Sequence, residues 1–297
     1  MKKKKLKRRN KLVVSVVMPV YNAGDFLMDS IESILSQSLQ DFEFIIVDDL
    51  SSDGSWELIK KYAKRYKKLK VFRNKKHLGV SETVKLAIQK SRGRFIARMD
   101  ADDIAIHYRL KTQLNYLLSN PKVVALGGQC QVINAKGEII GRKEFPTDFE
   151  DIYKYIFKFV PVQQPTLMIA KKRLPKDFLF YRDGMNTAEE VELFFKLFQY
   201  GKVENLPQTL LKYRIHSNNT SLKNLRQTFL LTLLARIKAV LVYGYIPTVS
   251  GVLTTLAQFL IVIFLPHKTT LWLYEKIRNL FSLNKEILVR FRLAKIV

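Results

Sequence analysis

The chain has 297 residues, of which 47% are apolar, and its 51 Lys and Arg exceed its 26 Asp and Glu to give a formal charge of +25 at pH 7. This composition suits one large domain, alone or with an appendage, and the charge favours an anionic partner such as phosphate, acidic lipid or nucleic acid. The single cysteine, Cys130, excludes an intrachain disulfide and a cysteine zinc cluster, and it fits a reducing compartment.

The positive charge is concentrated at the two ends of the chain. Residues 1–11 carry eight bases and no acid, and residues 221–297 carry eleven bases and two acids. Basic segments beside apolar sequence predict contact with an anionic membrane surface. For residues 1–11 taken alone, a solvated tail is the alternative interpretation.

The first twenty residues combine features of a signal peptide with those of a buried strand. A basic stretch precedes an apolar run at 12–20, as in a signal peptide. However, Pro19 interrupts this run, and Tyr21 and Asn22 stand where a cleavage site would need small residues. Because the run is rich in valine, we interpret it as a buried strand.

Strand and helix patterns alternate through the first hundred residues. Apolar runs predict strands at 13–18, 42–47, 70–73 and 94–99. Helical spacing and capping residues predict helices at 26–35, after 51–54 and at 81–90. This order implies an α/β fold with a largely parallel sheet and helices on both faces. Ligands of such sheets bind at the carboxyl ends of the strands, where acids stand at 48–49 and 100–103.

The next hundred residues show a less regular alternation, without an internal repeat. The expected elements are a helix at 105–118, a strand at 123–126, a hairpin within 132–140, a helix at 148–159, an extended segment at 162–169, a helix at 188–200 and an extended segment at 210–214.

The composition changes beyond about residue 224. Residues 239–266 contain no charged side chain, and the twenty residues 246–265 are long enough to cross a bilayer. Both flanks of this run are basic, so a single span would place one basic flank on the wrong side of the membrane. We therefore favour an in-plane or re-entrant segment, with a true span and a buried helix as the alternatives.

Two groups of aspartates follow predicted strands. Asp100, Asp102 and Asp103 repel one another unless a cation lies among them, and oxygen ligands suit Mg²⁺ or Mn²⁺. A carboxylate of the earlier pair, Asp48 and Asp49, could accept hydrogen bonds from a base or ribose. The alternative for such residues is a helix-capping or turn aspartate, and this is how we interpret Asp53.

Further acids, Glu189, Glu190 and Glu192, stand at the start of a predicted helix. A helix N-terminus favours acidic residues in any case, which gives them a purely structural interpretation. The functional alternative is a general base, which must be a carboxylate held near the nucleophile.

Taken together, these segments resemble family 2 glycosyltransferases over residues 13–227, in the same order. The segments that carry the resemblance are 16–22 (VVMPVYN), 46–54 (IVDDLSSDG), 96–104 (IARMDADDI), 164–166 (QPT), 188–190 (AEE), 205–207 (NLP) and 213–216 (YRIH). The resemblance implies a GT-A fold, a nucleoside-diphosphate-sugar donor, Mn²⁺ or Mg²⁺ as cofactor, and inversion at the anomeric carbon.

The resemblance also implies roles for individual residues. Those expected to line the nucleotide-sugar pocket are Pro19, Tyr21, Asp49 and Asp100. Those expected near the metal on the diphosphate are Asp102, Asp100 and His216, although a lone His after a strand is as often a packing residue. Glu190 is expected to deprotonate the acceptor, with Glu189 as the substitute base.

Two positions depart from the family pattern. The catalytic pair usually ends in Asp but ends here in Glu190, which offers the same chemistry on a longer arm. Lys85 stands where many relatives carry Asn, which could alter the contacts to the donor.

The domains expected from these patterns are a basic tail at 1–11, a glycosyltransferase domain at 12–223 and a helical membrane-associating region at 224–297. The acceptor is expected to be a saccharide or lipid-linked molecule in cell-surface polysaccharide or lipopolysaccharide synthesis, handled at the cytoplasmic face of the cell membrane. A dehydrogenase is disfavoured because no Gly-X-Gly-X-X-Gly follows the first strand, and a nucleic-acid partner because no binding motif is present. The remaining alternative is a catalytically impaired, membrane-associated relative that only binds.

Overall fold

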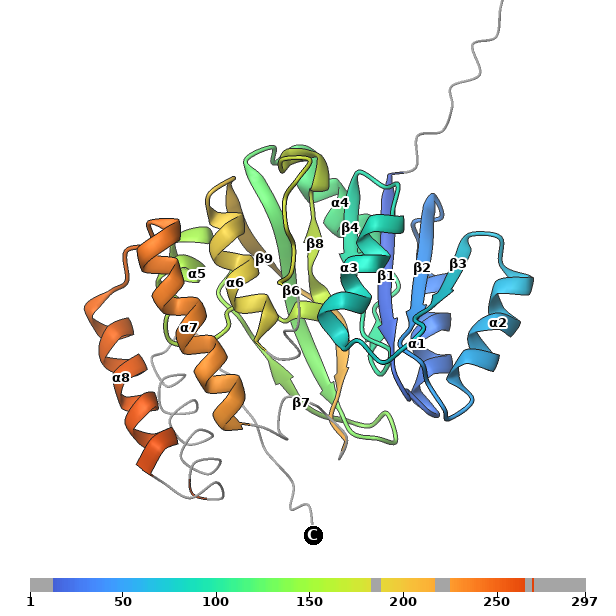
Figure 1. The fold of residues 1–297 in the computed structure, drawn as a ribbon. Coiled ribbons are helices and arrows are strands. Elements are labelled where there is room, and N and C mark those ends of the chain that lie inside the picture. Colours follow the sequence, from blue (N-terminus) through green and yellow to red (C-terminus); the bar gives the residue numbers. More distant parts are fainter. Residues whose placement is uncertain (1–12, 183–187, 217–224, 265–268, 270–297) are drawn as a thin grey trace, which may run out of the picture.

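The structure is a computed structural model that describes residues 13–182, 188–216, 225–264 and 269. Its centre is a sheet of nine strands in the order β3-β2-β1-β4-β8-β6-β9-β5, with β7 paired to β6 (Figure 1). The strands are β1 (Val14–Val20), β2 (Phe42–Asp48), β3 (Leu69–Arg73), β4 (Phe95–Arg98), β5 (Ile104–Ala105), β6 (Val123–Ile133), β7 (Ile139–Lys143), β8 (Met168–Ile169) and β9 (Lys202–Arg214).

The direction of the strands brings several loops to one edge of the sheet. β1 runs parallel to β2 and β4, and β6 runs parallel to β9. β8 lies antiparallel between β4 and β6, so β9 has the same direction as β1. The residues that follow β1, β2, β4 and β9 therefore meet at a single carboxyl edge, as ligand sites of α/β sheets do.

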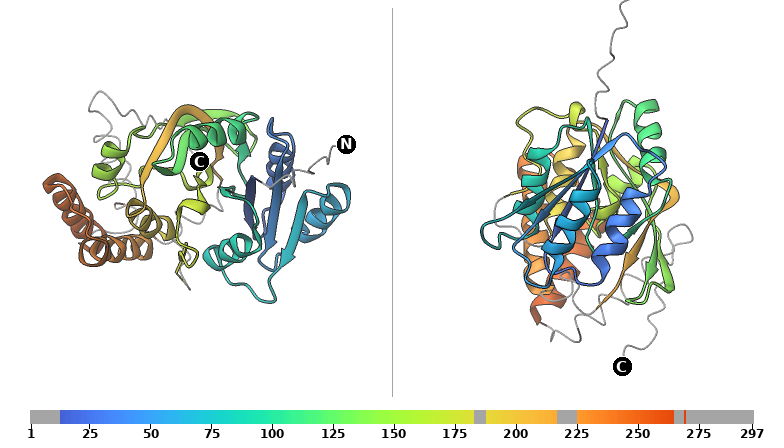
Figure 2. Two further views of the ribbon diagram at one scale, coloured as in Figure 1. Left: turned by 90° about the horizontal axis from the view of Figure 1, so that it is seen from above. Right: turned by 90° about the vertical axis from the view of Figure 1, so that its right-hand side faces the viewer.

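Helices cover both faces of the sheet (Figure 2). The helices are α1 (Phe26–Leu35), α2 (Ser55–Arg65), α3 (Val80–Lys90), α4 (Arg109–Ser119), α5 (Phe149–Tyr155), α6 (Glu189–Phe198), α7 (Leu225–Tyr243) and α8 (Val249–Phe264). One core contains residues of α1, α2 and α4, and the other contains residues of α3, α5, α6 and α7. β2 supplies Phe44 and Ile46 to the first core and Ile45 to the second, which is why its sequence is a continuous apolar run.

The predicted α/β class and the alternation over residues 13–99 are confirmed. The segment predicted as extended at 162–169 is instead a 3-10 turn, Gln164–Thr166, followed by the two-residue strand β8. The last strand begins at Lys202 rather than near Leu210, since its first half pairs with β6 through irregular registers.

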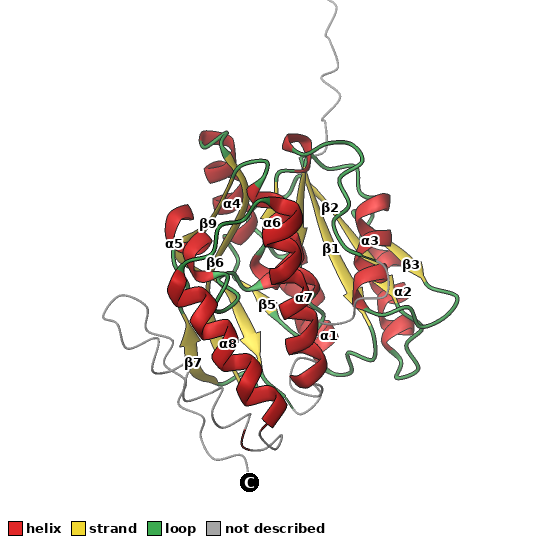
Figure 3. Cartoon of the chain, turned by 60° about the vertical axis from the view of Figure 1, so that its left-hand side comes forward, coloured by secondary structure: helices red, strands yellow, loops and turns green. Residues whose placement is uncertain are grey.

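The C-terminal helices α7 and α8 pack side by side at the end of the molecule opposite α2 (Figures 1 and 3). Ala235 and Ala239 of α7 are buried in the core that α6 shares. Among the described residues, no helix is both long and apolar enough to cross a membrane. The basic tail at 1–11 and the flank beyond residue 269 lie outside the described residues.

Candidate active site

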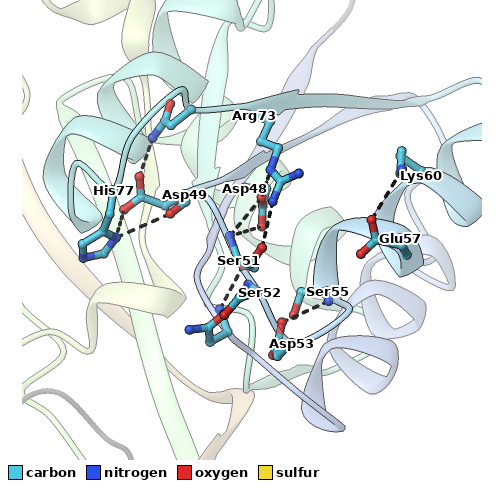
Figure 4. Close-up of polar contacts among 12 residues, drawn as sticks. Asp48, Asp49, Ser51, Ser52, Asp53, Ser55, Glu57, Lys60, Arg73 and His77 are labelled. Atoms are coloured by element: carbon cyan, nitrogen blue, oxygen red, sulfur yellow. Dashed lines mark hydrogen bonds and ion pairs between the residues drawn. The ribbon is translucent and has the colours of Figure 1, made fainter.

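The loops after β1 and β2 are locked together by the Ser-Ser-Asp-Gly segment (Figure 4). Asn22, whose φ is 47°, donates its backbone N–H to Ser51 Oγ at 3.0 Å. Asp53 accepts from the N–H of Gly24 at 2.8 Å and from that of Ser55 at 3.0 Å. Burial alone would raise the pKa of Asp53, but these hydrogen bonds outweigh it and lower the pKa. The prediction that Asp53 is a turn aspartate is confirmed.

Asp48, the first acid of the earlier pair, is fully buried and serves the same scaffold. Its Oδ2 lies 2.9 Å from Arg73 Nε and accepts from the N–H of Ser51 at 3.2 Å. Because Arg73 also donates to the carbonyl of Ser51 at 2.8 Å, this pair fixes the turn that leaves β2.

Asp49, the second acid, orders the loop after β3. Its carboxylate accepts from Asn74 Nδ2 at 2.6 Å, from the N–H groups of Leu78 and Gly79 at 2.9 and 2.8 Å, and contacts His77 Nδ1 at 2.9 Å. A carboxylate has about four acceptor positions, so these partners occupy Asp49 fully. A nucleobase would have to share one oxygen with them or displace the His77 ring. Base recognition by Asp49 stays a prediction.

An exposed aromatic pair lies beside Asp49, which its His77 contacts. The rings of Tyr21 and His77 lie 4.0 Å apart at 30°, and both side chains are about half exposed. Pro19 is half-buried on β1, opposite Val47. Sequence reasoning singled out Tyr21 and Pro19 but missed His77, because a lone His in a basic loop carries no recognisable pattern.

The acidic loop after β4 is tethered at each of its three aspartates. Asp100 Oδ1 lies 2.8 Å from Arg98 Nη2, and Ser30 Oγ of α1 donates to the Asp100 carbonyl at 2.8 Å. Asp103 Oδ1 accepts from the backbone N–H of Arg214 at 2.8 Å. Asp102 Oδ2 lies 2.9 Å from Nε2 of His216, a residue 114 positions further along the chain.

Arg214 at the end of β9 joins this loop to its surroundings. Its buried guanidinium donates to the carbonyl of Asp102 at 2.8 Å and to that of Ala135 at 3.1 Å, and it pairs with Asp29 of α1 at 3.1 Å. Arg214 lies in one of the segments that resemble the family. Its role could not be predicted, because its partners Asp29, Asp102 and Ala135 lie in three segments that are distant in the sequence.

The acidic loop lacks full compensation for its charge. Burial, reinforced by Asp102 and Asp100, raises the pKa of Asp103 well above its ordinary value. Burial also raises the pKa of Asp100, against the opposing effect of Arg98. In the described part of the chain, Asp103 Oδ2 is buried without a hydrogen-bond partner. These features indicate a local environment that favours an added cation.

The predicted metal ligands could hold an ion only together with oxygens of a bound substrate. No three His, Cys, Asp or Glu side chains of the described residues lie close enough to hold a metal by themselves. Asp102 and His216 do meet, and they offer one oxygen and one nitrogen donor. Mg²⁺ and similar ions often take one or two carboxylates together with substrate phosphates, so this donor set fits an ion that a diphosphate completes.

The predicted base lies at the start of α6, after Ala188 in the left-handed conformation with φ of 58°. Glu190 is half-buried, while the side chain of Glu189 lies outside the described residues. Glu192, two residues further, faces α7 instead: it accepts from Lys238 Nζ at 2.6 Å and Tyr243 Oη at 2.7 Å, beside a cavity of about 410 Å³. Thus Glu192 belongs to the packing of α6, and the role of Glu190 stays a prediction.

Comparisons with known proteins agree with this arrangement. A family model described as Glycosyl transferase family 2 matches residues 15–179. The O-antigen biosynthesis glycosyltransferase WbnJ of Escherichia coli is 32% identical in an alignment of 218 residues that covers 70% of this chain and 82% of that protein.

Two solved structures share the fold at lower identity. TarS 1–349 of S. aureus in complex with UDP-GlcNAc has a TM-score of 0.62 and 18% identity, over 85% of this chain and 72% of that one. The mannosyltransferase PcManGT from Pyrobaculum calidifontis, in complex with GDP-Man and Mn²⁺, has a TM-score of 0.53 and 14% identity, over 90% of this chain and 80% of that one.

Proposed function

The chain belongs to glycosyl transferase family 2, and we propose that it moves a sugar from a nucleoside-diphosphate-sugar to a hydroxyl of a saccharide or lipid-linked acceptor, with inversion. The likeness to TarS confirms the predicted GT-A fold. The observation that carries the proposal is the meeting of Asp102 with His216 at the carboxyl edge that also bears Tyr21 and Asp49.

The donor nucleotide is assigned to the edge formed by the loops after β1, β2 and β3. Tyr21 offers an exposed aromatic face on which a base can stack, Pro19 lies on β1, and Asp49 directly follows β2. Two structures of the same fold hold UDP-GlcNAc and GDP-Man, which supports a donor of this class.

The diphosphate is assigned to the acidic loop, where Asp102 and His216 would hold Mn²⁺ or Mg²⁺ together with its oxygens. Asp100 as a further ligand stays a prediction. When bound, the ion would neutralise the negative charge that develops on the leaving diphosphate. The Mn²⁺ in the mannosyltransferase complex supports a metal in this fold. Arg214 and Arg98 keep the loop in place through the Asp102 carbonyl and the Asp100 carboxylate.

Glu190 is assigned the role of general base toward the hydroxyl of the acceptor. Its carboxylate takes the proton of the acceptor hydroxyl while that oxygen bonds to the anomeric carbon. The bond between this carbon and the phosphate oxygen breaks on the opposite face, so the bonding pair leaves with the nucleoside diphosphate and the configuration inverts. The enzyme holds base, acceptor and leaving group in line.

The acceptor class and location rest on the relative and on charge. WbnJ is named for O-antigen biosynthesis, which supports a saccharide acceptor in cell-surface glycan synthesis. The basic ends and the uncharged run at 239–266 support a place at the cytoplasmic face of the cell membrane.

A panel of nucleotide sugars tests the proposal. Purified protein incubated with UDP-, GDP- and other nucleotide sugars should release the nucleoside diphosphate from at least one donor with Mn²⁺, and lose this activity in EDTA. Binding of nucleoside diphosphate without turnover of any donor, with a broad panel of saccharide acceptors present, would favour the catalytically impaired alternative.

A further inference from the structure

The helix α8 turns most of its polar side chains toward the protein, although Ser250 in its first turn is exposed. Thr254, Thr255 and Gln258 are buried, and Thr255 donates to the carbonyl of Phe157 at 2.9 Å. Gln258 donates to the carbonyl of Lys158 at 3.0 Å.

Arg236 of α7 completes this inward-facing polar layer. Its guanidinium contacts Thr255 Oγ1 at 3.2 Å and Gln258 Oε1 at 2.9 Å, and donates to the carbonyl of Lys158 at 2.8 Å. A helix that packs on a core normally buries an apolar stripe. In α8 the polar groups are bonded internally, so the helix is oriented with its apolar side outward.

The outward side of α8 is an apolar stripe along its whole length. The residues of this α8 stripe are Val249, Leu253, Leu256, Leu260 and Ile263. Their spacing of four, three, four and three places them on one face of a helix. The neighbouring α7 exposes a stripe of the same kind, made of Leu230, Leu234, Ile237 and Leu241. Soluble monomers rarely expose contiguous apolar patches beyond about a few hundred Å², and larger ones mark interaction sites.

The charge around these helices identifies the partner. Residues 221–297 contain eleven Lys and Arg and two Asp and Glu. Of these bases, Arg236 is buried in the polar layer and Lys238 pairs with Glu192, so the excess of positive charge comes from the remaining nine. An apolar stripe within a segment of excess positive charge complements an anionic bilayer, whose headgroups attract the bases and whose interface accepts the aliphatic side chains. The 16 residues of α8 extend for about 24 Å, less than the roughly 30 Å of a hydrocarbon core.

We propose that α8 lies in the plane of an anionic membrane with the α8 stripe inserted into the interfacial layer. This inference rests on the proposed membrane location and specifies the surface that provides it. Because the stripe extends over the full helix, contact along its side rather than at one end uses all five residues. α8 lies at the end of the molecule opposite β3 and α2, and it ends on the same side as the carboxyl ends of β1 and β2 (Figure 1).

A single fluorescent label tests the depth of α8 directly. The only cysteine, Cys130, is buried, and burial raises the pKa of its thiol to about 12, so it reacts poorly with thiol reagents. Full-length Leu256→Cys carries an environment-sensitive nitrobenzoxadiazole label on α8, and Leu118→Cys carries it on exposed α4 as the control. Vesicles with 30% phosphatidylglycerol should shift the emission of the first label to the blue and leave the second unchanged.

Two results of this experiment would overturn the proposal. An equal shift at both labels would mean that α8 has no special contact with lipid. A label at 256 that is already shifted without vesicles, and does not respond to them, would mean that another part of the chain or a second copy covers the stripe.

A triple substitution tests whether the α8 stripe supplies affinity. Leu253→Gln, Leu256→Gln and Leu260→Gln change side chains that are 53–61% exposed, and Met28→Gln, Leu118→Gln and Ile139→Gln change side chains that are 48–57% exposed elsewhere. The α8 triple variant should bind the anionic vesicles about 10²-fold or more weakly, and the control triple variant should bind as the unchanged chain does.

Donor hydrolysis in solution separates this proposal from the proposed chemistry. The α8 triple variant should keep the hydrolysis rate of the unchanged chain, and the vesicle measurements stand even if no donor is turned over. Unchanged vesicle binding by the α8 triple variant would contradict the proposal. So would a change from dimer to monomer in sedimentation with vesicle binding intact, because the stripe would then join two copies.

Discussion

Replacing Asp102 by Asn isolates the charge at the proposed metal site from its geometry. Asn has the size of Asp and can keep the contact with His216 Nε2, which is 2.9 Å long in the structure. The carbonyl of Asp102, which anchors Arg214, is a backbone group and is unaffected. The variant should therefore fold with nearly unchanged thermal stability and differ chiefly by one missing negative charge.

The expected cost follows from that charge and its partial burial. Asp102 is 29% exposed and His216 is 14% exposed, so the site is only partly screened by water. One unit-charge interaction at about 4 Å near a protein surface amounts to about 4 kcal/mol. Losing a comparable stabilising group at a developing anion costs about 3–4 kcal/mol, or about 10²–10³ in rate.

The assay is the rate of nucleoside diphosphate release against Mn²⁺ concentration, for the unchanged chain and for two variants. Asp102→Asn should need more Mn²⁺ and remain about 10²–10³-fold slower at saturation. Asp53→Asn is the control: it removes the charge of another loop aspartate, one that bonds only Gly24 and Ser55 within the described part, and should keep the metal response. Full activity of Asp102→Asn, or of the unchanged chain in excess EDTA, would refute the reasoning.

Three further predictions concern residues around the site. Asp49→Asn should weaken binding of UDP or GDP about tenfold by calorimetry, because it disturbs the loop that carries His77; an unchanged dissociation constant would contradict this. Arg214→Met should lower the free energy of unfolding by about 2–3 kcal/mol in urea, less than for a fully buried pair because Asp29 is half exposed; no loss would mean that these bonds contribute nothing. Glu192→Gln should cost about 1–3 kcal/mol at pH 7. Although burial opposes ionisation, Lys238 and Tyr243 lower the pKa of Glu192, so its stabilisation is present above its ordinary pKa and is lost as pH falls through the lowered one. A difference between variant and unchanged chain that does not shrink as the pH is lowered would argue against this.

Residues with strong local burial patterns could be located from the sequence. β2 was expected at 42–47 and extends over Phe42–Asp48, since a strand buried on both faces is a continuous apolar run. The first half of β9 could not be found in this way. Glu204, Asn205 and Pro207 break any apolar alternation there, and the strand forms only because β6 pairs with it.

The parts of the site that lie in sequence motifs could be predicted from the sequence. The parts that depend on contacts between distant segments could not. Asp102 and His216 were placed together by the resemblance, and the structure brings their side chains to 2.9 Å. The link from Arg214 to Asp29 spans 185 positions and has no local pattern. The outward orientation of α8 likewise depends on Arg236, which lies on another helix and binds the polar side chains of α8.

The proposed general base is tested most directly by single-turnover transfer with Glu190→Gln and Glu189→Gln, each saturated with donor, Mn²⁺ and an identified acceptor. Gln keeps the size and hydrogen bonding of Glu but removes its basicity, so Glu190→Gln should bind donor normally and transfer about 10²–10⁴-fold more slowly. Adjacent helical residues point about 100° apart, so Glu189→Gln should affect the chemical step much less. Near-normal transfer by Glu190→Gln would contradict the account, and its pairing with an inactive Glu189→Gln would assign the base to the neighbouring residue.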